Sequence, residues 1–302
     1  MTAPSRSVAP EAACYTSSRL MLPELRDARP EPAVAPEPDA SLPPPPLKWA
    51  GGKRWQLDLL KPHWRRHAHR RLVEPFCGGL AVALGLAPER ALLNDVNPHL
   101  INFYRSLQQG LEPPDRRHTK REYYAVRNQF NALIRTGRSE SMEAAGLFYY
   151  LNRTGYNGLC RFNRKGGFNV PFGRHRTIKY ERDLTDYVEP LSKWQFTCGP
   201  FEAVPLEPDD FVYADPPYDV EFTHYSGTHF SWDDQVRTAG WLAQHPGPVI
   251  LSNQATPKIL DLYRDLGYEV QTHPAPRRIS CNGDRAPAQE VLAFRNLSDV
   301  AT

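Results

Sequence analysis

The sequence predicts an α/β fold, with a mainly parallel sheet and a separate block inserted between its two halves. Short apolar strands alternate with helices before residue 113 and again after residue 190. This alternation is typical of a parallel sheet with helices on both faces. Residues 113–190 begin as an amphipathic helix and continue as a loop-like segment. We therefore expect a core of residues 47–112 and 191–297, with residues 113–190 as a mainly helical module.

The first 46 residues differ from the rest of the chain, since they are rich in proline and poor in large apolar side chains. Such a segment cannot bury enough surface to fold. We expect residues 1–46 to be disordered, the folded domain to begin at Leu47, and residues 298–302 to form a short tail.

The first half of the predicted sheet contains two strands. Residues 72–76 are expected to form a strand that leads into the turn Cys77-Gly78-Gly79 and a helix over 80–86. Residues 91–94 are expected to form the next strand, which ends at Asp95, and Asn97 is placed to cap the following helix. The apolar face of that helix comprises Leu100, Ile101, Phe103, Tyr104 and Leu107.

The later elements follow from the same periodicities. Helical spacing of apolar residues predicts a helix at the start of the inserted block, and residues 152–176 are loop-like. Residues 211–214 form an expected strand that ends at Asp215, and residues 248–251 form another that ends at Ser252-Asn253. Helices are expected over 234–244 and 257–266. The apolar residues of the inserted helix are Tyr123, Val126, Phe130, Leu133 and Ile134.

Composition narrows the classes of protein. The 302 residues carry a formal net charge of only +3, yet basic residues are in local excess between positions 153 and 182. Such an excess suits a polyanionic partner, or else forms a solvated basic face. The five cysteines are scattered, which predicts a reducing compartment without a disulfide framework or a cysteine metal site. The basic residues are Arg153, Arg161, Arg164, Lys165, Arg174, Arg176, Lys179 and Arg182.

The chain has no apolar run of the roughly 18 residues that a membrane-spanning helix needs, and its N-terminus has no signal-peptide core. A soluble cytoplasmic protein is therefore expected.

Polar residues at four strand ends predict a shared crevice, because ligands of open parallel sheets bind outside the carboxyl ends of the strands. Gly78 and Gly79 would let a ligand approach the backbone, although many strand–helix turns contain glycine for steric reasons alone. Asp95, about 17 residues later, could accept both ribose hydroxyls of a nucleoside or could simply cap a helix.

The segment Lys48-Trp49-Ala50-Gly51-Gly52-Lys53 contains Gly-Gly-Lys, which suggests a phosphate loop. The spacing of that motif is absent, and Arg54 stands where the motif needs Ser or Thr, so we exclude a nucleoside triphosphatase. Trp49 and Lys53 could instead hold an aliphatic or sulfonium chain and a carboxylate.

The motif Asp215-Pro216-Pro217-Tyr218 is the strongest chemical signal. Consecutive prolines fix φ and remove two N–H donors, so the Asp215 carboxylate and the Pro216 carbonyl can both act as acceptors at one point. An exocyclic amine is a poor nucleophile because its lone pair is delocalised into the ring. Two fixed acceptors would hold its hydrogens and stabilise the developing positive charge, while Tyr218 stacks on the base. The alternative is a proline-rich turn without a catalytic role.

Together these motifs resemble those of Dam-type (D12 class) DNA adenine methyltransferases, in the order that the family shows and over roughly residues 47–296. The segments that carry the resemblance are Lys48-Trp49-Ala50-Gly51-Gly52-Lys53, Glu74-Pro75-Phe76-Cys77-Gly78-Gly79, Asn94-Asp95-Val96-Asn97, Asp215-Pro216-Pro217-Tyr218, 151–163, 167–173 and 277–283.

The resemblance implies a Rossmann-like methyltransferase core with a mixed, mainly parallel sheet, and S-adenosyl-L-methionine as methyl donor. The acidic residue that the family usually has before Phe201 is absent here. The resemblance also implies a target-recognition region over 152–173, with Arg153 as a further candidate for DNA contact. The implied donor-binding residues are Trp49, Lys53, Phe76, Gly78, Gly79, Asp95, Phe201 and Asp215. The residues at positions that read GATC are Asn157, Leu159, Arg161 and Pro171.

We therefore predict site-specific transfer of a methyl group to N6 of an adenine flipped out of double-stranded DNA, within GATC. The residues expected to carry the reaction are Asp215, Pro216, Pro217 and Tyr218. The basic region would bind phosphates, and Arg161 would contact a guanine edge. No membrane or obligate protein partner is inferred, and the expected location is the cytoplasm of a bacterium, with a bacterial or phage gene as the source.

Methyltransferases that catalyse other reactions tend to have different residues at these positions. A cytosine-C5 enzyme requires a cysteine nucleophile, usually after proline, and the chain has no Pro-Cys pair. Cytosine-N4 enzymes tend to carry Ser in place of Asp215, and glutamine methylases tend to carry Asn. An RNA substrate and a DNA-binding protein with a decayed active site remain alternatives. The sequence does not distinguish a solitary enzyme from a phage or restriction-modification enzyme.

Overall fold

The computed structural model describes residues 42–173, 178, 180–218, 230–275 and 288–297. The chain divides into two units, Met1–Pro36 and Glu37–Thr302, and the description below concerns the second. Arg174, Arg176, Lys179 and the motif at 277–283 lie outside the described residues, as do residues 1–41 and 298–302 of the predicted tails.

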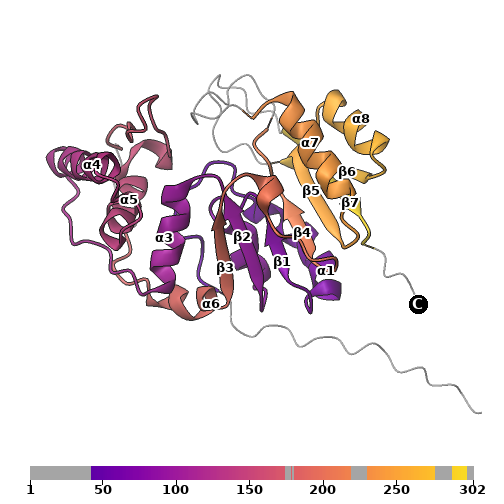
Figure 1. Cartoon of the computed structure of the whole chain (residues 1–302), viewed down its shortest axis with the longest axis horizontal. Coiled ribbons are helices and arrows are strands. Elements are labelled where there is room, and N and C mark those ends of the chain that lie inside the picture. The colour runs from indigo at the N-terminus through magenta and orange to yellow at the C-terminus, as the bar shows by residue number, and fades with distance from the viewer. Residues whose placement is uncertain (1–41, 174–177, 179, 219–229, 276–287, 298–302) are drawn as a thin grey trace, which may run out of the picture. The chain divides into compact units, whose positions relative to one another are not determined.

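Seven strands form one sheet in the order β3-β2-β1-β4-β5-β7-β6 (Figure 1). Neighbours from β3 to β5 are parallel, and β7 runs antiparallel to β5 and β6. The predicted mixed, mainly parallel sheet is thus confirmed. The strands are β1 (Leu72–Glu74), β2 (Ala91–Asp95), β3 (Trp194–Cys198), β4 (Phe211–Ala214), β5 (Val249–Gln254), β6 (Glu269–Ala275) and β7 (Ala288–Arg295).

The helix α3 lies between the β3 edge of the sheet and the helix pair α4–α5 (Figure 1). Phe103 of α3 stacks on Tyr149 of α5 with ring centroids 5.5 Å apart, and both rings belong to one hydrophobic core. Helix α5, from the block predicted to be inserted, therefore packs directly on α3. The helices are α1 (Leu57–His67), α2 (Ala81–Leu86), α3 (Pro98–Gln108), α4 (Lys120–Arg135), α5 (Met142–Thr154), α6 (Val188–Ser192), α7 (Trp232–Ala243) and α8 (Pro257–Asp265).

The best-predicted elements are those with a cap or a clear apolar face. The Asn97 side chain accepts hydrogen bonds from the N–H groups of His99 and Leu100, so it caps α3 as expected. The apolar face predicted for α3 is fully buried. In α4 the predicted apolar residues are buried too, except Ile134, which is partly exposed.

Several predicted boundaries are wrong, and three of them have a clear physical reason. Strand β1 ends at Glu74 and not at residue 76, because Pro75 has no N–H to donate to a neighbouring strand. Strand β5 continues to Gln254, since Ser252 and Asn253 pair with β7. Residues 152–154 belong to α5 and not to a loop; Thr154 is buried and its hydroxyl donates to the carbonyl of Tyr150.

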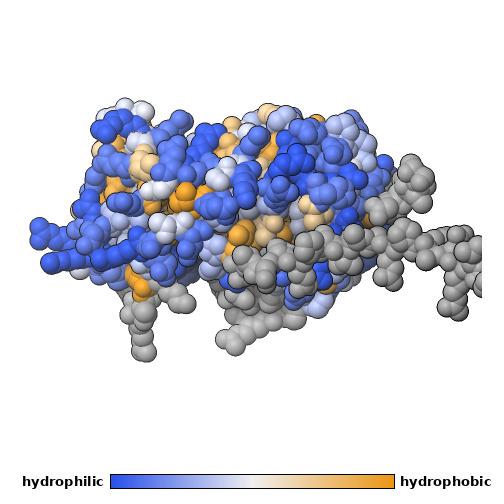
Figure 2. Space-filling model, turned by 90° about the horizontal axis from the view of Figure 1, so that it is seen from below, coloured by the Kyte–Doolittle hydropathy of each residue, from blue (hydrophilic) through white to orange (hydrophobic). Residues whose placement is uncertain are grey.

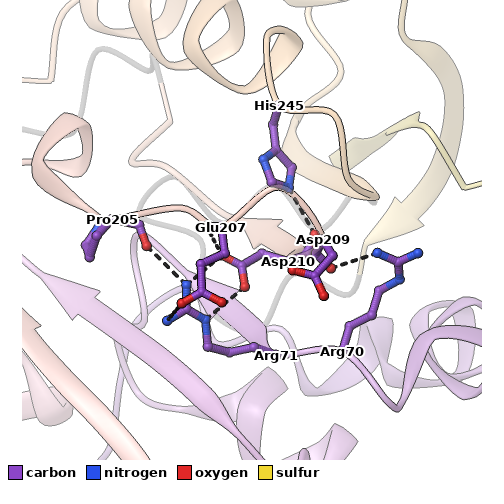
Figure 3. Close-up of polar contacts among 7 residues, drawn as sticks. All are labelled: Arg70, Arg71, Pro205, Glu207, Asp209, Asp210 and His245. Atoms are coloured by element: carbon purple, nitrogen blue, oxygen red, sulfur yellow. Dashed lines mark hydrogen bonds and ion pairs between the residues drawn. The ribbon is translucent and has the colours of Figure 1, made fainter.

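An ion-pair network joins the amino ends of β1 and β4 (Figure 3). The Arg71 guanidinium donates to both carboxylate oxygens of Asp210, over 2.8 and 2.7 Å. Arg70 donates to the Asp209 carbonyl, and His245 contacts the Asp210 carbonyl. This network fixes the two central strands at the end of the sheet opposite the predicted crevice.

The surface on the side of α6, where β3 begins, is mostly hydrophilic, with small scattered hydrophobic areas (Figure 2). Within the described ranges, no helix has both the length and the apolar character needed to cross a bilayer.

Candidate active site

The four polar strand ends lie side by side. Strands β2, β1, β4 and β5 are consecutive in the sheet, so the carboxyl ends that carry Asp95, the glycine turn, Asp215 and Asn253 share one edge. The sheet extends from β1 towards β2 on one side and from β4 towards β5 on the other. Such a topological switch point is where open α/β sheets bind ligands. The strand ends predicted to border a crevice are thus brought together at the centre of the sheet.

Asp95 is fixed by two backbone donors at the end of β2. Its Oδ2 accepts from the N–H of Gly78 over 3.1 Å, and its Oδ1 accepts from the N–H of Asn97 over 2.9 Å. Burial raises the pKa of the Asp95 carboxyl, while these backbone hydrogen bonds oppose the rise. The Asp95 carboxylate therefore binds the glycine turn, whereas Asn97 caps α3. A carboxylate can accept about four hydrogen bonds, so Asp95 keeps some acceptor capacity.

The two glycines after β1 lie against the indole of Trp49. A Cβ on Gly78 would lie 2.8 Å from Trp49 Nε1, and a Cβ on Gly79 would lie 2.7 Å from Trp49 Cβ. Gly78 also has a φ of 43°, which favours glycine. The side chain of Trp49 thus makes the close approach to the glycine backbone that was expected of a ligand. This contact joins the predicted segments 48–53 and 74–79.

Lys53 and Asp215 form an ion pair beside this turn. The Nζ–Oδ2 distance is 2.9 Å, and Nζ also donates to the carbonyl of Gly51 over 2.9 Å. Lys53 is buried. Asp215 Oδ1 is also buried and has no hydrogen-bond partner of good geometry among the described residues. Burial raises the pKa of the Asp215 carboxyl, while the charge of Lys53 opposes the rise and the Tyr218 hydroxyl, which lies near the carboxylate, helps to oppose it. The site therefore presents a buried acceptor oxygen.

The proline turn after β4 is anchored by a relay of buried amides. The Pro217 carbonyl accepts from Gln235 Nε2 of α7 over 2.7 Å, and Gln235 Oε1 accepts from Asn253 Nδ2 over 2.9 Å. Gln235 and Asn253 are both fully buried. In the same turn, Lys53 Nζ lies 4.7 Å from the centre of the Tyr218 ring. Sequence reasoning found Asn253 at a strand end but missed Gln235.

A second buried network lies beneath the site. Tyr213 donates to Gln56 Oε1 over 2.7 Å, and Gln56 Nε2 donates to Ser252 Oγ and to Glu290 over 2.9 and 3.0 Å. Burial raises the pKa of Glu290 and raises that of Glu74 well above its ordinary value. Glu74 lies in the quoted motif 74–79 but was assigned no role from the sequence. Glu290 was not identified, because an isolated acidic residue in a strand has no sequence signature.

Phe76 and Phe201 form an aromatic pair, with ring centroids 5.5 Å apart. Phe201 is buried, whereas Phe76 keeps part of its ring exposed. Asn94 fixes the backbone just before each ring, since its Nδ2 donates to the carbonyls of Pro75 and Gly199, each over 3.0 Å. Two residues distant in sequence are thus brought together as the predicted site requires.

The predicted recognition residues lie in one loop system after α5. Arg161 donates to Asn169 through Nε, over 2.8 Å to Oδ1, and through Nη2, over 3.3 Å to the carbonyl. Asn157 is exposed, with a φ of 52°, and Pro171 is exposed as well. Leu159 is only partly exposed because it packs against the core. The same loop reaches the end of β2 at Cys160, whose Sγ accepts from Asn97 Nδ2 over 3.3 Å.

The chain matches the family model of the D12 class N6 adenine-specific DNA methyltransferases over residues 49–275. It is 37% identical over 272 residues to the DNA adenine methylase of Vibrio cholerae, an alignment that covers 82% of this chain and 94% of that one. It is 35% identical over 268 residues to the DNA N-6-adenine-methyltransferase of Escherichia phage P1, covering 82% of this chain but only 35% of the phage protein. It is also 34% identical over 241 residues to the type II methyltransferase M1.LlaDCHI of Lactococcus lactis subsp. cremoris, covering 72% and 84%.

Proposed function

Because this chain belongs to the D12 class of N6 adenine-specific DNA methyltransferases, we propose that it methylates a flipped adenine within a specific duplex site, GATC. The observation that carries this assignment of roles is Asp215. One of its oxygens is paired with Lys53, while the other is buried and has no hydrogen-bond partner of good geometry among the described residues. A buried acceptor of this kind suits an amine that must lose hydrogen-bonded water before it reacts.

The methyl donor of this family, S-adenosylmethionine, supplies a methyl group activated by a sulfonium centre. The residues of the site fit its parts. The Asp95 carboxylate, held by backbone donors, retains acceptor positions for ribose hydroxyls. Phe76 exposes part of its ring beside Phe201, which suits a stacked purine. Trp49 with Gly78 and Gly79, and Lys53 with Asp215, would border the methionine part.

In the proposed reaction the protein positions and polarises the adenine amine. Asp215 Oδ1 accepts one N6 hydrogen, the Pro216 carbonyl accepts the other, and the negative carboxylate stabilises the positive charge that develops on N6. Lys53 lies over one face of the Tyr218 ring, so the base would stack on the opposite face. The bound donor would supply its methyl group directly to N6 and would leave as S-adenosylhomocysteine. The proton that N6 then loses would pass to solvent, so no covalent enzyme intermediate is needed.

Residues 113–190 would serve as the target-recognition module. Asn169 orients the Arg161 guanidinium through two hydrogen bonds, which leaves further N–H donors for a guanine edge. Asn157, Leu159 and Pro171 would complete the reading of GATC, and Arg153 would lie near the DNA backbone. A DNA substrate and the bacterial and phage relatives support a location in the cytoplasm of a bacterial or phage-infected cell.

The test is to replace Asp215 with Ala and to measure methyl transfer to a GATC duplex and to a duplex with one base changed. We expect turnover on GATC to fall by a factor of about 100 or more, because an electrostatic contact made in the transition state is lost. Near-normal turnover of Asp215→Ala would overturn the catalytic assignment. Sequencing of modified bases after expression in a methylation-free host tests the GATC assignment separately.

A further inference from the structure

We infer that Asn152 is a positioning residue that holds one short segment, residues 46–49, in place. This segment contacts both Tyr156–Gly158, which we call the recognition turn, and the glycine turn at Gly78 and Gly79, which we call the donor site. We call residues 46–49 the bridging segment. The inference rests on the proposed roles of these two sites, and it assigns to Asn152 the task of keeping them in register.

Asn152 holds Lys48 by both of its backbone groups. The Lys48 N–H donates to Asn152 Oδ1 over 2.9 Å, and Asn152 Nδ2 donates to the Lys48 carbonyl over 2.8 Å. The same Nδ2 lies 3.4 Å from the carbonyl of Gly158. Asn152 is 1% exposed. A side-chain amide offers a donor and an acceptor side by side. The Asn152 amide therefore satisfies both backbone groups of Lys48, as a neighbouring strand would in a sheet.

On the recognition side, the bridging segment fits closely against the turn that contains Asn157. A Cβ on Gly158 would collide with the Cβ of Lys48, and the φ of Gly158 is 64°. Lys48 Nζ donates to the Arg153 carbonyl over 2.9 Å, and Arg153 Nη1 donates to the Pro46 carbonyl over 3.2 Å. The segment and the turn therefore cannot shift independently.

On the donor side, the residue after Lys48 is Trp49. Its indole lies against Gly78 and Gly79, and the Gly78 N–H is bound to Asp95. A shift of the Lys48 backbone is transmitted covalently to Trp49 and through the indole to the glycine turn. Asn152 is thus placed so that its loss would disturb both the recognition turn and the donor site.

The inserted block contains a matched control. Asn131 of α4 makes the same two-bond clamp with the backbone of Phe168, since its Nδ2 donates to the Phe168 carbonyl over 3.0 Å and the Phe168 N–H donates to its Oδ1 over 2.7 Å. Phe168 lies in the same loop system as Arg161 but outside the bridging segment. Loss of Asn131 would loosen recognition without reaching Trp49.

The experiment compares Asn152→Ala with Asn131→Ala. Affinity for S-adenosylhomocysteine is measured by calorimetry without DNA, and discrimination is measured as the ratio of kcat/KM for GATC and a one-base variant. We expect Asn152→Ala to weaken S-adenosylhomocysteine binding about tenfold and to lower discrimination about tenfold, because two hydrogen bonds are lost. Asn131→Ala should lower discrimination and leave the affinity within about twofold.

Wild-type affinity in Asn152→Ala would overturn the inference, and so would an equal loss of affinity in both variants. If Asn152→Ala fails to fold, Asn152→Asp decides, because its carboxylate still accepts from Lys48 but cannot donate; its affinity should fall as well. A wild-type enzyme without preference for GATC would refute the proposed recognition site. The affinity comparison, which needs no DNA, would still decide the role of Asn152 at the donor site.

Discussion

Replacement of Gln235 tests whether its hydrogen bond to the Pro217 carbonyl holds the proline turn in place. Pro216 and Pro217 have no N–H, so the turn has few backbone donors with which to anchor itself. Gln235 supplies the anchor from α7, and Asn253 fixes the orientation of its amide. Gln235→Met keeps a side chain of similar length and removes both hydrogen bonds. We expect this variant to fold and to lose the alignment of the two acceptors.

The size of the effect follows from the contacts. Loss of a buried hydrogen bond that leaves its partner unsatisfied costs about 1–3 kcal/mol. Asn253 Nδ2 keeps a second bond, to Tyr263 Oη over 3.1 Å, so we expect a loss near the lower end, about 1–2 kcal/mol. In a domain of this size that loss lowers Tm by roughly 2–8 °C. Turnover is more sensitive, because misplacement by about 1 Å can cost a factor of about 100.

The assay is single-turnover methylation of a GATC duplex, well below the Tm of each variant. Gln235→Met should lower the rate about 10- to 100-fold, while the KM values for DNA and donor change little. Gln235→Glu adds a pH test, since a protonated carboxyl can donate to Pro217; its rate relative to wild type should rise as the pH falls. Gln271→Met, at an exposed amide of β6, is the control. A wild-type rate in Gln235→Met would refute the reasoning.

Three further outcomes follow from buried charges. Asp210→Asn breaks the buried pair with Arg71 and should cost about 3 kcal/mol by urea unfolding, whereas Glu207→Gln, on the exposed arm of the network, should cost less than about 1 kcal/mol. Glu74→Gln should stabilise the fold at alkaline pH. Burial raises the pKa of Glu74, so stability is lost as pH rises through that pKa, and the gain in Tm should vanish where Glu74 is protonated in both states. Binding of S-adenosylmethionine at mildly acidic pH should release protons, measured by calorimetry in buffers of different ionisation enthalpy.

The location of the site could be predicted because it depends on local pattern and one general rule. Polar residues after apolar strands mark strand ends, and parallel strands bring those ends to one edge. The observed neighbours β2-β1-β4-β5 follow this rule. The helix α3 could be predicted with its cap, since Asn97 and the apolar face are both local signals. These features need no knowledge of which distant residues touch.

The supporting networks could not be predicted, because their partners are far apart in sequence. Gln56 binds Tyr213 across 157 residues, Ser252 across 196 and Glu290 across 234. A single buried glutamine leaves no periodic pattern. The antiparallel pairing of β7 with β5 extended that strand beyond its predicted end for the same reason. The clamp at Asn152 could not be predicted, because the sequence pattern indicates a loop from residue 152, whereas Asn152 belongs to α5.

Proton release on donor binding follows from the excess of buried carboxyl groups over basic groups around the site. Burial raises the pKa of Glu74, Asp95, Asp215 and Glu290, and Lys53 is the cation paired with Asp215. A sulfonium beside these carboxyls would favour their charged forms, which lowers each pKa and expels protons. S-adenosylhomocysteine has the same adenosine and amino-acid parts but no sulfonium, so it isolates the charge. It should release fewer protons, because its binding buries the carboxyls without adding the positive centre. Equal release by both ligands would show that the carboxyls do not sense the sulfonium, and would place it away from Asp215.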